Sequence, residues 1–219
     1  MTYVSWAVFF EGASDHAYFN SLIPRVMQDI VLRLGTRNST IPEAPAADFR
    51  RRAYQEVAEK ACAERDSFHI LFVHSDTGGR ALAAQLEERS DRFCQIMNDH
   101  CRWPTRRCVT ITPRHETEAW VLADPEAVTG ALGYVRDPGE LGLPRDAVEA
   151  ERLGDPKAVL SAAVRKVRGR RRAFEPRQIF AAVAQRQSLE KLRRSTSYGA
   201  FEERLLAALA DIGCIEPPA

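Results

Sequence analysis

The chain has 219 residues and a formal net charge of +1, from 31 lysines and arginines and 30 aspartates and glutamates. A chain of this length buries roughly 70% of the surface that its unfolded form exposes, so a compact fold needs no cross-links. The even charge balance excludes a strong overall attraction to nucleic acid, although it leaves room for a local basic patch.

Three features of the sequence indicate where in the cell the protein is expected. No apolar run approaches the length of a membrane span, and the N-terminus lacks the charged leader of a signal peptide. The five cysteines are odd in number and scattered, which argues against a disulfide framework and for a reducing compartment. We therefore expect a soluble, cytoplasmic protein that has no membrane partner.

Short apolar runs predict buried strands, and the helix-favouring segments between them predict helices. In chain order, the expected elements are a strand at 3–10, helices at 16–34 and 46–65, a strand at 70–74, a helix at 80–97, a strand at 107–112 and helices at 157–168, 176–186, 188–194 and 198–211. Ser14 or Asp15 is the expected N-cap of the first helix. Strands that alternate with helices favour a mostly parallel α/β sheet. We expect an α/β domain over residues 1–130 and a helical C-terminal extension over residues 131–219.

Acidic residues follow each of the expected strands. Glu11 comes after the first strand, Asp76 after the second and Glu118 after the third. Because parallel strands end at one edge of the sheet, we expect these three side chains to converge there. Carboxylate oxygens suit magnesium or manganese, and a bound divalent cation can polarise a phosphate and activate a water molecule. By spacing alone, the three acids could equally be unrelated capping or surface residues.

Other polar residues near these turns are weaker candidates. His74 lies at the end of an expected strand, where it could contact a phosphate, act as a general acid or be a hydrogen-bonded structural residue. Arg80 and Arg114 flank two of the acidic turns and could bind phosphate or merely neutralise the carboxylates.

The densest basic stretch is Arg165–Arg172, which includes Arg170, Arg171 and Arg172. Such a run could follow a nucleic-acid backbone with salt-dependent affinity. It could also be an ordinary solvated surface, which is the more frequent role of charge runs.

Several motifs resemble known families. The segments Phe9-Phe-Glu-Gly-Ala-Ser-Asp15 and Leu71-Phe-Val-His-Ser-Asp-Thr-Gly78 resemble the Toprim domain of primases, type IA topoisomerases and OLD-type nucleases. The segment 112–124, together with 155–157 and 192–201, is similar to a Toprim-related bacterial family of unknown function (domain of unknown function 4276), which is often encoded beside ABC-type ATPases in phage-defence loci. This resemblance covers nearly the whole chain and implies a Toprim-like, Rossmann-like fold.

The resemblance also implies roles for individual residues. Glu11 matches the Toprim glutamate, which serves as a metal ligand or general acid/base, and Asp76 matches the first aspartate of the Asp-x-Asp motif. Gly78 stands where the second aspartate is expected, unless the register shifts by two and His74 replaces the first. In either register one carboxylate is missing, and Glu118, or less favourably Glu116, could restore the charge.

Together these features predict a nuclease that depends on magnesium or manganese and acts on DNA or RNA as the effector of an anti-phage defence system. An ATPase of the ABC or AAA type would be its partner, because this chain has no Walker loop. Two alternatives stay open: an interaction module with a decayed site that docks on the ATPase, and a non-catalytic nucleic-acid binder. A homo-oligomer is compatible with each of these functions.

Overall fold

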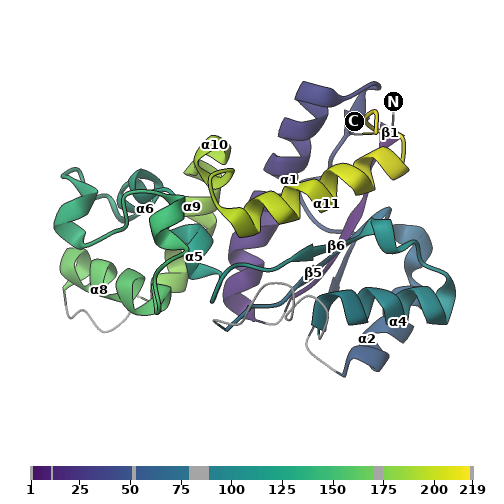
Figure 1. The fold of residues 1–219 in the computed structure, drawn as a ribbon, viewed down its shortest axis with the longest axis horizontal. Coiled ribbons are helices and arrows are strands. Elements are labelled where there is room, and N and C mark those ends of the chain that lie inside the picture. Colours follow the sequence, from purple (N-terminus) through teal and green to yellow (C-terminus); the bar gives the residue numbers. More distant parts are fainter. Residues whose placement is uncertain (1, 11, 51–52, 79–88, 170–174, 218–219) are drawn as a thin grey trace.

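In the computed structural model, a four-stranded parallel sheet lies between two groups of helices (Figure 1). The structure describes residues 2–10, 12–50, 53–78, 89–169 and 175–217. The strand order is β4-β2-β5-β6, with bounds Ala47–Phe49 for β4, Trp6–Phe9 for β2, Ile70–His74 for β5 and Cys108–Ile111 for β6. A separate two-stranded parallel ladder joins β1 (Thr2–Tyr3) to β3 (Ser39–Thr40). The parallel α/β architecture expected from the sequence is confirmed.

Helices cover both faces of this sheet. They are α1 (Ala13–Leu34) and α11 (Thr196–Asp211) on one face and α2 (Tyr54–Ala63) and α4 (Asp91–Cys101) on the other. Ile70 and Phe72 of β5 belong to the core under α1 and α11, whereas Leu71 and Val73 belong to the core under α2 and α4. Residues 70–73 form an unbroken apolar run because an interior parallel strand is buried on both sides.

After the last strand, the regular elements that the structure describes are helices joined by loops. The α-helices of this region are α5 (Glu118–Val121), α6 (Pro125–Leu132), α7 (Ala147–Ala150), α8 (Pro156–Arg168), α9 (Phe180–Arg186), α10 (Leu189–Leu192) and α11. The 3-10 segments among the described residues are η1 (Arg65–Ser67), η3 (Thr105–Arg107), η4 (Pro138–Leu141) and η5 (Pro176–Ile179). Helices α5 to α9 gather to one side of the sheet, and α11 runs back across it (Figure 1). Within the described ranges, no helix is both long and apolar enough to cross a bilayer.

The expected helix over 46–65 is wrong at its N-terminal end. Residues Ala47–Phe49 form the edge strand β4, which pairs in parallel with β2, and the helix begins only at Tyr54. Ala47 and Phe49 are buried while Asp48 between them is half-buried, which is the alternation of a strand. Three residues are too few for this period to stand out in the sequence. The helix expected over 80–97 lies partly outside the described residues, and α4 is the part that the structure describes.

Buried polar contacts attach the extension to the segment that follows the sheet. The indole Nε1 of Trp120 donates a hydrogen bond of 2.8 Å to the Oγ of Ser197. The carboxylate of Glu151 accepts hydrogen bonds from the backbone N–H groups of Thr196 and Ser197, at 2.9 Å each, and from the hydroxyl of Ser195 at 2.7 Å. These contacts fix the start of α11, whose N-cap is Ser195.

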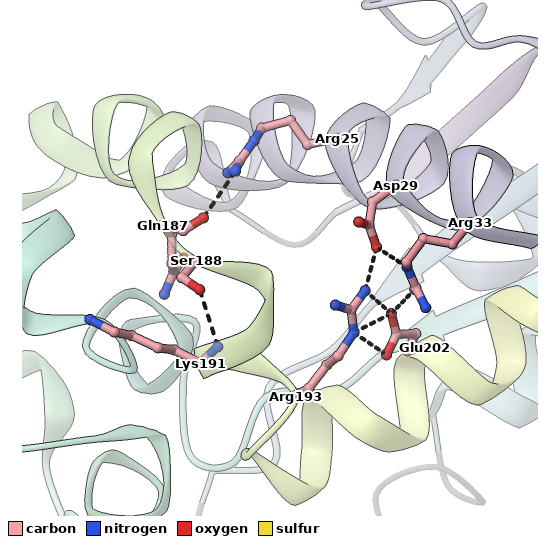
Figure 2. A network of polar contacts seen from close by, with 8 residues as sticks. All are labelled: Arg25, Asp29, Arg33, Gln187, Ser188, Lys191, Arg193 and Glu202. Carbon is pink, nitrogen blue, oxygen red and sulfur yellow. Dashed lines mark hydrogen bonds and ion pairs between the residues drawn. The ribbon is translucent and has the colours of Figure 1, made fainter.

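An arginine network joins α1 to the last two helices (Figure 2). Arg193, which follows α10, donates from Nε to both carboxylate oxygens of Glu202 on α11, at 2.9 and 3.0 Å. The same guanidinium contacts Asp29 on α1, which also accepts a 2.9 Å hydrogen bond from Arg33. The network therefore holds α1 against the last two helices, which follow it far along the chain.

Four of the five cysteines form disulfides. Cys62 of α2 is bonded to Cys101 at the end of α4, and Cys94 of α4 is bonded to Cys108 at the start of β6. Cys214 is buried and forms no disulfide. The expectation of a chain without disulfides is therefore wrong. The packing of α4 between α2 and β6 brings these cysteines together. The spacing of the cysteines in the sequence does not predict that packing or the resulting pairs.

Candidate functional site

The parallel sheet places two strand-end loops side by side. The backbone N–H of Ser75 donates to the carbonyl of Ile111 at 3.1 Å, and the N–H of Gly78 donates to the carbonyl of His115 at 3.0 Å. The loop after β5 therefore continues the pairing of β5 with β6 beyond the end of the sheet. This is the edge at which open α/β sheets usually bind ligands.

His74, the last residue of β5, lies at the centre of this edge. Its side chain is fully buried between two carboxylates. Nδ1 is 3.4 Å from Oδ2 of Asp15, and Nε2 is 3.2 Å from Oδ1 of Asp76. Neither approach has the alignment of a hydrogen bond, and each is an ion pair only when the imidazole is protonated. The Oγ1 of Thr117 lies 3.3 Å from Nε2, within hydrogen-bond distance. The imidazole thus links the first turn of α1 to the loop after β5.

Asp15 holds three segments together. Its Oδ2 accepts a hydrogen bond of 2.9 Å from the backbone N–H of Gly12, and its Oδ1 accepts one of 2.8 Å from the hydroxyl of Thr117. The first contact closes a capping box in which Gly12 is the N-cap and Asp15 is the third helical residue. The expectation of Ser14 or Asp15 as the N-cap is therefore wrong, because the carboxylate reaches back to the cap rather than forming it.

Three carboxyl groups of the two loops repel one another. Burial raises the pKa of Glu118 from 4.5 to about 7, and the negative charges of Glu116 and Asp76 add to the rise. Burial also raises the pKa of Glu116, and the charge of Asp76 adds to this rise. Lys157 on α8 opposes both shifts. Burial is therefore the main cause of both shifts, and repulsion among the three carboxyl groups adds to it.

Two oxygens of this group suit a hard cation. Oδ1 of Asp76 and Oε2 of Glu116 are buried and have no hydrogen-bond partner in the part of the chain that the structure describes. Oxygens that are shielded from water and unbonded are costly unless a cation or donor joins them. Among the described side chains, no three His, Cys, Asp or Glu residues already have the spacing of a metal site. A divalent cation bound here would satisfy the two oxygens, which by themselves do not form a coordination shell.

A pocket of about 330 Å³ opens beside Glu116, and its far wall comes from the helical extension. It is lined by Gly78, His115, Glu116, Gly154, Asp155, Pro156 and Lys157. His115 has a left-handed backbone with a φ of 65°, and the Oγ1 of Thr77 accepts its N–H at 2.6 Å. Such a conformation is unfavourable for a histidine and is retained where surrounding contacts enforce it.

Gly78, which stands where the Toprim resemblance implies a second aspartate, has an unusual backbone conformation. Its φ is 56°, in the left-handed region that favours glycine, although a Cβ added there would meet no atom within 4 Å. An aspartate at this position would have room but would sit on a less favourable backbone.

The structure brings some of the predicted site residues together, and others lie outside the described part of the chain. His74 and Asp76 lie together, and Glu118 interacts electrostatically with Asp76. Arg114 is exposed at the beginning of the loop that follows β6. The remaining predicted residues, Glu11, Arg80, Arg170, Arg171 and Arg172, lie outside the described residues.

Sequence reasoning missed three residues of this site. Asp15 was expected only as a helix cap, and Thr117 and Lys157 lie in the segments 112–124 and 155–157 that carry the family resemblance, but no role was expected for either. The spacing of Gly12 and Asp15 is that of a capping box, and it could have shown that the carboxylate turns back toward the strand end.

Comparison with known proteins gives one positive result. A family model described as "Domain of unknown function (DUF4276)" matches residues 10–206, a range that contains all the described site residues. The search of curated proteins and the search of solved structures each gave no match. The chain therefore belongs to the DUF4276 family of domains of unknown function.

Proposed function

We propose that this protein is a Toprim-like nuclease that hydrolyses phosphodiester bonds with the help of magnesium or manganese. The observation that carries the proposal is the convergence of Asp76, Glu116 and Glu118 on adjacent strand-end loops, with two buried oxygens that lack a hydrogen-bond partner among the described residues. Clustered carboxylates that are partly removed from water bind hard divalent cations.

Asp76, Glu116 and Glu118 would hold the cation, together with Glu11 as the Toprim resemblance implies. The ion would polarise the phosphate and activate a water molecule. His74 holds the Asp76 carboxylate in place through their 3.2 Å contact, and Asp15 fixes His74 from the other side. Glu118 can exchange a proton near neutral pH in the absence of the cation, because its pKa is about 7.

Nucleic acid, DNA or RNA, is the proposed substrate, and an ABC or AAA ATPase of the same defence system is the proposed partner. The resemblance to a family encoded beside such ATPases supports this partner. Arg165, Lys166 and Arg168 lie in the last turn of α8 and could contact a nucleic-acid backbone. These cations also lie where a helix dipole favours positive charge, so their position has a structural explanation as well.

A second candidate is an interaction module that has lost catalysis. The observation that favours it is Gly78, which occupies the expected place of a carboxylate on a backbone that favours glycine. Such a module would keep the fold and dock on the ATPase without binding a cation. Calorimetric titration separates the two: magnesium or manganese binding that disappears in Asp76→Asn favours the nuclease, and absence of binding to the wild type favours the module.

The decisive experiment is a cleavage assay with the full chain, alone and with its ATPase. Plasmid DNA, bulk RNA and tRNA are each incubated with magnesium or manganese. We expect cleavage by the wild type, loss of cleavage in Asp76→Asn, Glu118→Gln and Glu11→Ala, and wild-type cleavage in Glu203→Gln. Glu203 is a suitable control because it is exposed on α11. If no substrate is cut under any of these conditions, the proposal is rejected.

A further inference from the structure

Lys157 occupies a position that helix electrostatics disfavour. It is the second residue of α8, which begins at Pro156 and is capped by Asp155, whose Oδ1 accepts the N–H of Ala158 at 2.7 Å. The N-terminus of a helix carries partial positive charge and repels a lysine. Apart from the cap, the first turn of α8 contains no acidic residue to offset this repulsion. A charged residue that is unfavourable at its position in a helix, with no nearby group to offset the cost, is a candidate functional residue.

The surroundings of Lys157 indicate what that function is. Its side chain is exposed, lines the 330 Å³ pocket with His115 and Glu116, and forms no ion pair with a described residue. Its positive charge nevertheless reaches the carboxyl groups of both Glu116 and Glu118. The ammonium group is therefore near the acidic loops but forms no ion pair with any described carboxylate.

A phosphodiester that approaches these loops meets three carboxyl groups. Its own negative charge is repelled unless positive charge offsets theirs. A lysine ammonium is a mobile point charge that binds phosphate oxygens well. We propose that Lys157 contacts the phosphate group of the substrate in the pocket beside Glu116, so that the helical extension supplies a binding residue to the site. This inference rests on the proposed nuclease function.

The test compares Lys157→Met with Lys60→Met, which removes the same charge from an exposed position in the last turn of α2, away from the pocket. Thermal unfolding, cleavage kinetics and the binding of a fluorescein-labelled oligonucleotide, with calcium in place of magnesium, are measured for both variants. Lys157→Met should unfold at the wild-type temperature or above it, whereas Lys60→Met should unfold lower. Lys157→Met should also weaken oligonucleotide binding and raise KM by roughly 10- to 100-fold. Lys157→Arg should restore part of the binding.

The outcomes separate this inference from the function on which it rests. Wild-type cleavage with unchanged KM and binding in Lys157→Met overturns the role of Lys157 and leaves the nuclease intact. If the wild type does not cleave but binding still depends on Lys157 and not on Lys60, the pocket binds phosphate and the nuclease proposal fails. A marked loss of thermal stability in Lys157→Met shows that the lysine is structural and overturns the inference.

Discussion

The carboxylate of Asp15 accepts a 2.8 Å hydrogen bond from the hydroxyl of Thr117, which lies 102 residues later in the chain. Both side chains are buried. Thr117 immediately precedes Glu118, and the other oxygen of Asp15 lies 3.4 Å from His74. One buried carboxylate therefore sets the relative positions of α1, the end of β5 and the loop after β6.

Removal of the Asp15 carboxylate should destabilise the protein and change the relative positions of the site residues. Asp15→Ala deletes the acceptor of the Gly12 N–H and one partner of the buried Thr117 hydroxyl, whose other polar contact is with Nε2 of His74 at 3.3 Å, for a combined loss of about 2–4 kcal/mol. Asp15→Asn keeps one acceptor oxygen and should lose less. Urea unfolding measures the free energies, and the cleavage assay should show a larger loss in Asp15→Ala than in Asp15→Asn.

Asp146→Ala is the matched control for this prediction. Asp146 caps α7 by accepting the N–H of Glu149 at 2.9 Å, but it lies outside the site. Its removal should cost about 1 kcal/mol and leave cleavage unchanged. Equal free energies of unfolding for Asp15→Ala and Asp146→Ala would show that Asp15 is an ordinary cap.

Glu118 should make the stability of the protein fall as pH rises. Its pKa increases from 4.5 in the unfolded chain to about 7 in the folded protein, so the folded state binds more protons between these values. The free energy of unfolding therefore decreases from pH 4.5 to pH 7, by on the order of 3 kcal/mol at most. Glu118→Gln cannot ionise and should be more stable than the wild type at pH 8, with little difference at pH 4.5.

Urea unfolding across this pH range checks the prediction, and Glu203→Gln should follow the wild-type curve throughout. Magnesium should restore part of the wild-type stability at pH 8, because it binds the ionised carboxylates of the folded state. The same addition should have a smaller effect on Glu118→Gln. A stability difference between Glu118→Gln and the wild type that does not change with pH would contradict a raised pKa.

The sequence allowed the sheet and part of the site to be predicted for one reason: β5 is interior. An interior parallel strand is apolar on both faces, so Ile70–His74 stands out, and its pairing on both sides places Asp76 at the sheet edge. Edge strand β4 was missed because Ala47–Phe49 is too short to show a period. Lys157 was missed because its place in the pocket depends on how α8 packs, and local sequence does not encode that packing.

The two disulfides should contribute unequal stability. Cys62 and Cys101 are separated by 39 residues and Cys94 and Cys108 by 14, so the first bridge restricts the unfolded chain more. Chain-entropy arguments give losses of about 4 and about 3 kcal/mol on removal of each bridge. Urea unfolding of Cys62→Ser with Cys101→Ser, and of Cys94→Ser with Cys108→Ser, measures these losses.

Thiol titration of the unfolded protein provides the control for this prediction. One reactive thiol, from Cys214, should appear without reductant, and five should appear after reduction. Reduction should also weaken the contact between Ser90 and Ser75, whose hydroxyls are 2.6 Å apart, because Cys94 anchors α4 one turn after Ser90. Five thiols before reduction would show that the bridges do not form in solution.

Arg193 should stabilise the fold far more than its neighbour Arg194. Arg193 donates three hydrogen bonds to Glu202 and also contacts Asp29, and the side chains of these partners are 13% and 30% exposed (Figure 2). Arg194 is 58% exposed and contacts only Asp146 among the described residues. Arg193→Ala should therefore cost about 1–3 kcal/mol, whereas Arg194→Ala should cost less than about 1 kcal/mol.

The cost of Arg193→Ala should also depend on pH. Burial alone would raise the pKa of Asp29, but the hydrogen bonds from Arg193 and Arg33 outweigh it and lower the pKa. This contribution to stability is present above the ordinary pKa of an aspartate and is lost as pH falls through the lowered value. Urea unfolding at pH 7 and pH 3 should show the difference between wild type and Arg193→Ala shrinking at pH 3. Equal costs for Arg193→Ala and Arg194→Ala at pH 7 would show that the network does not hold α1 to α11.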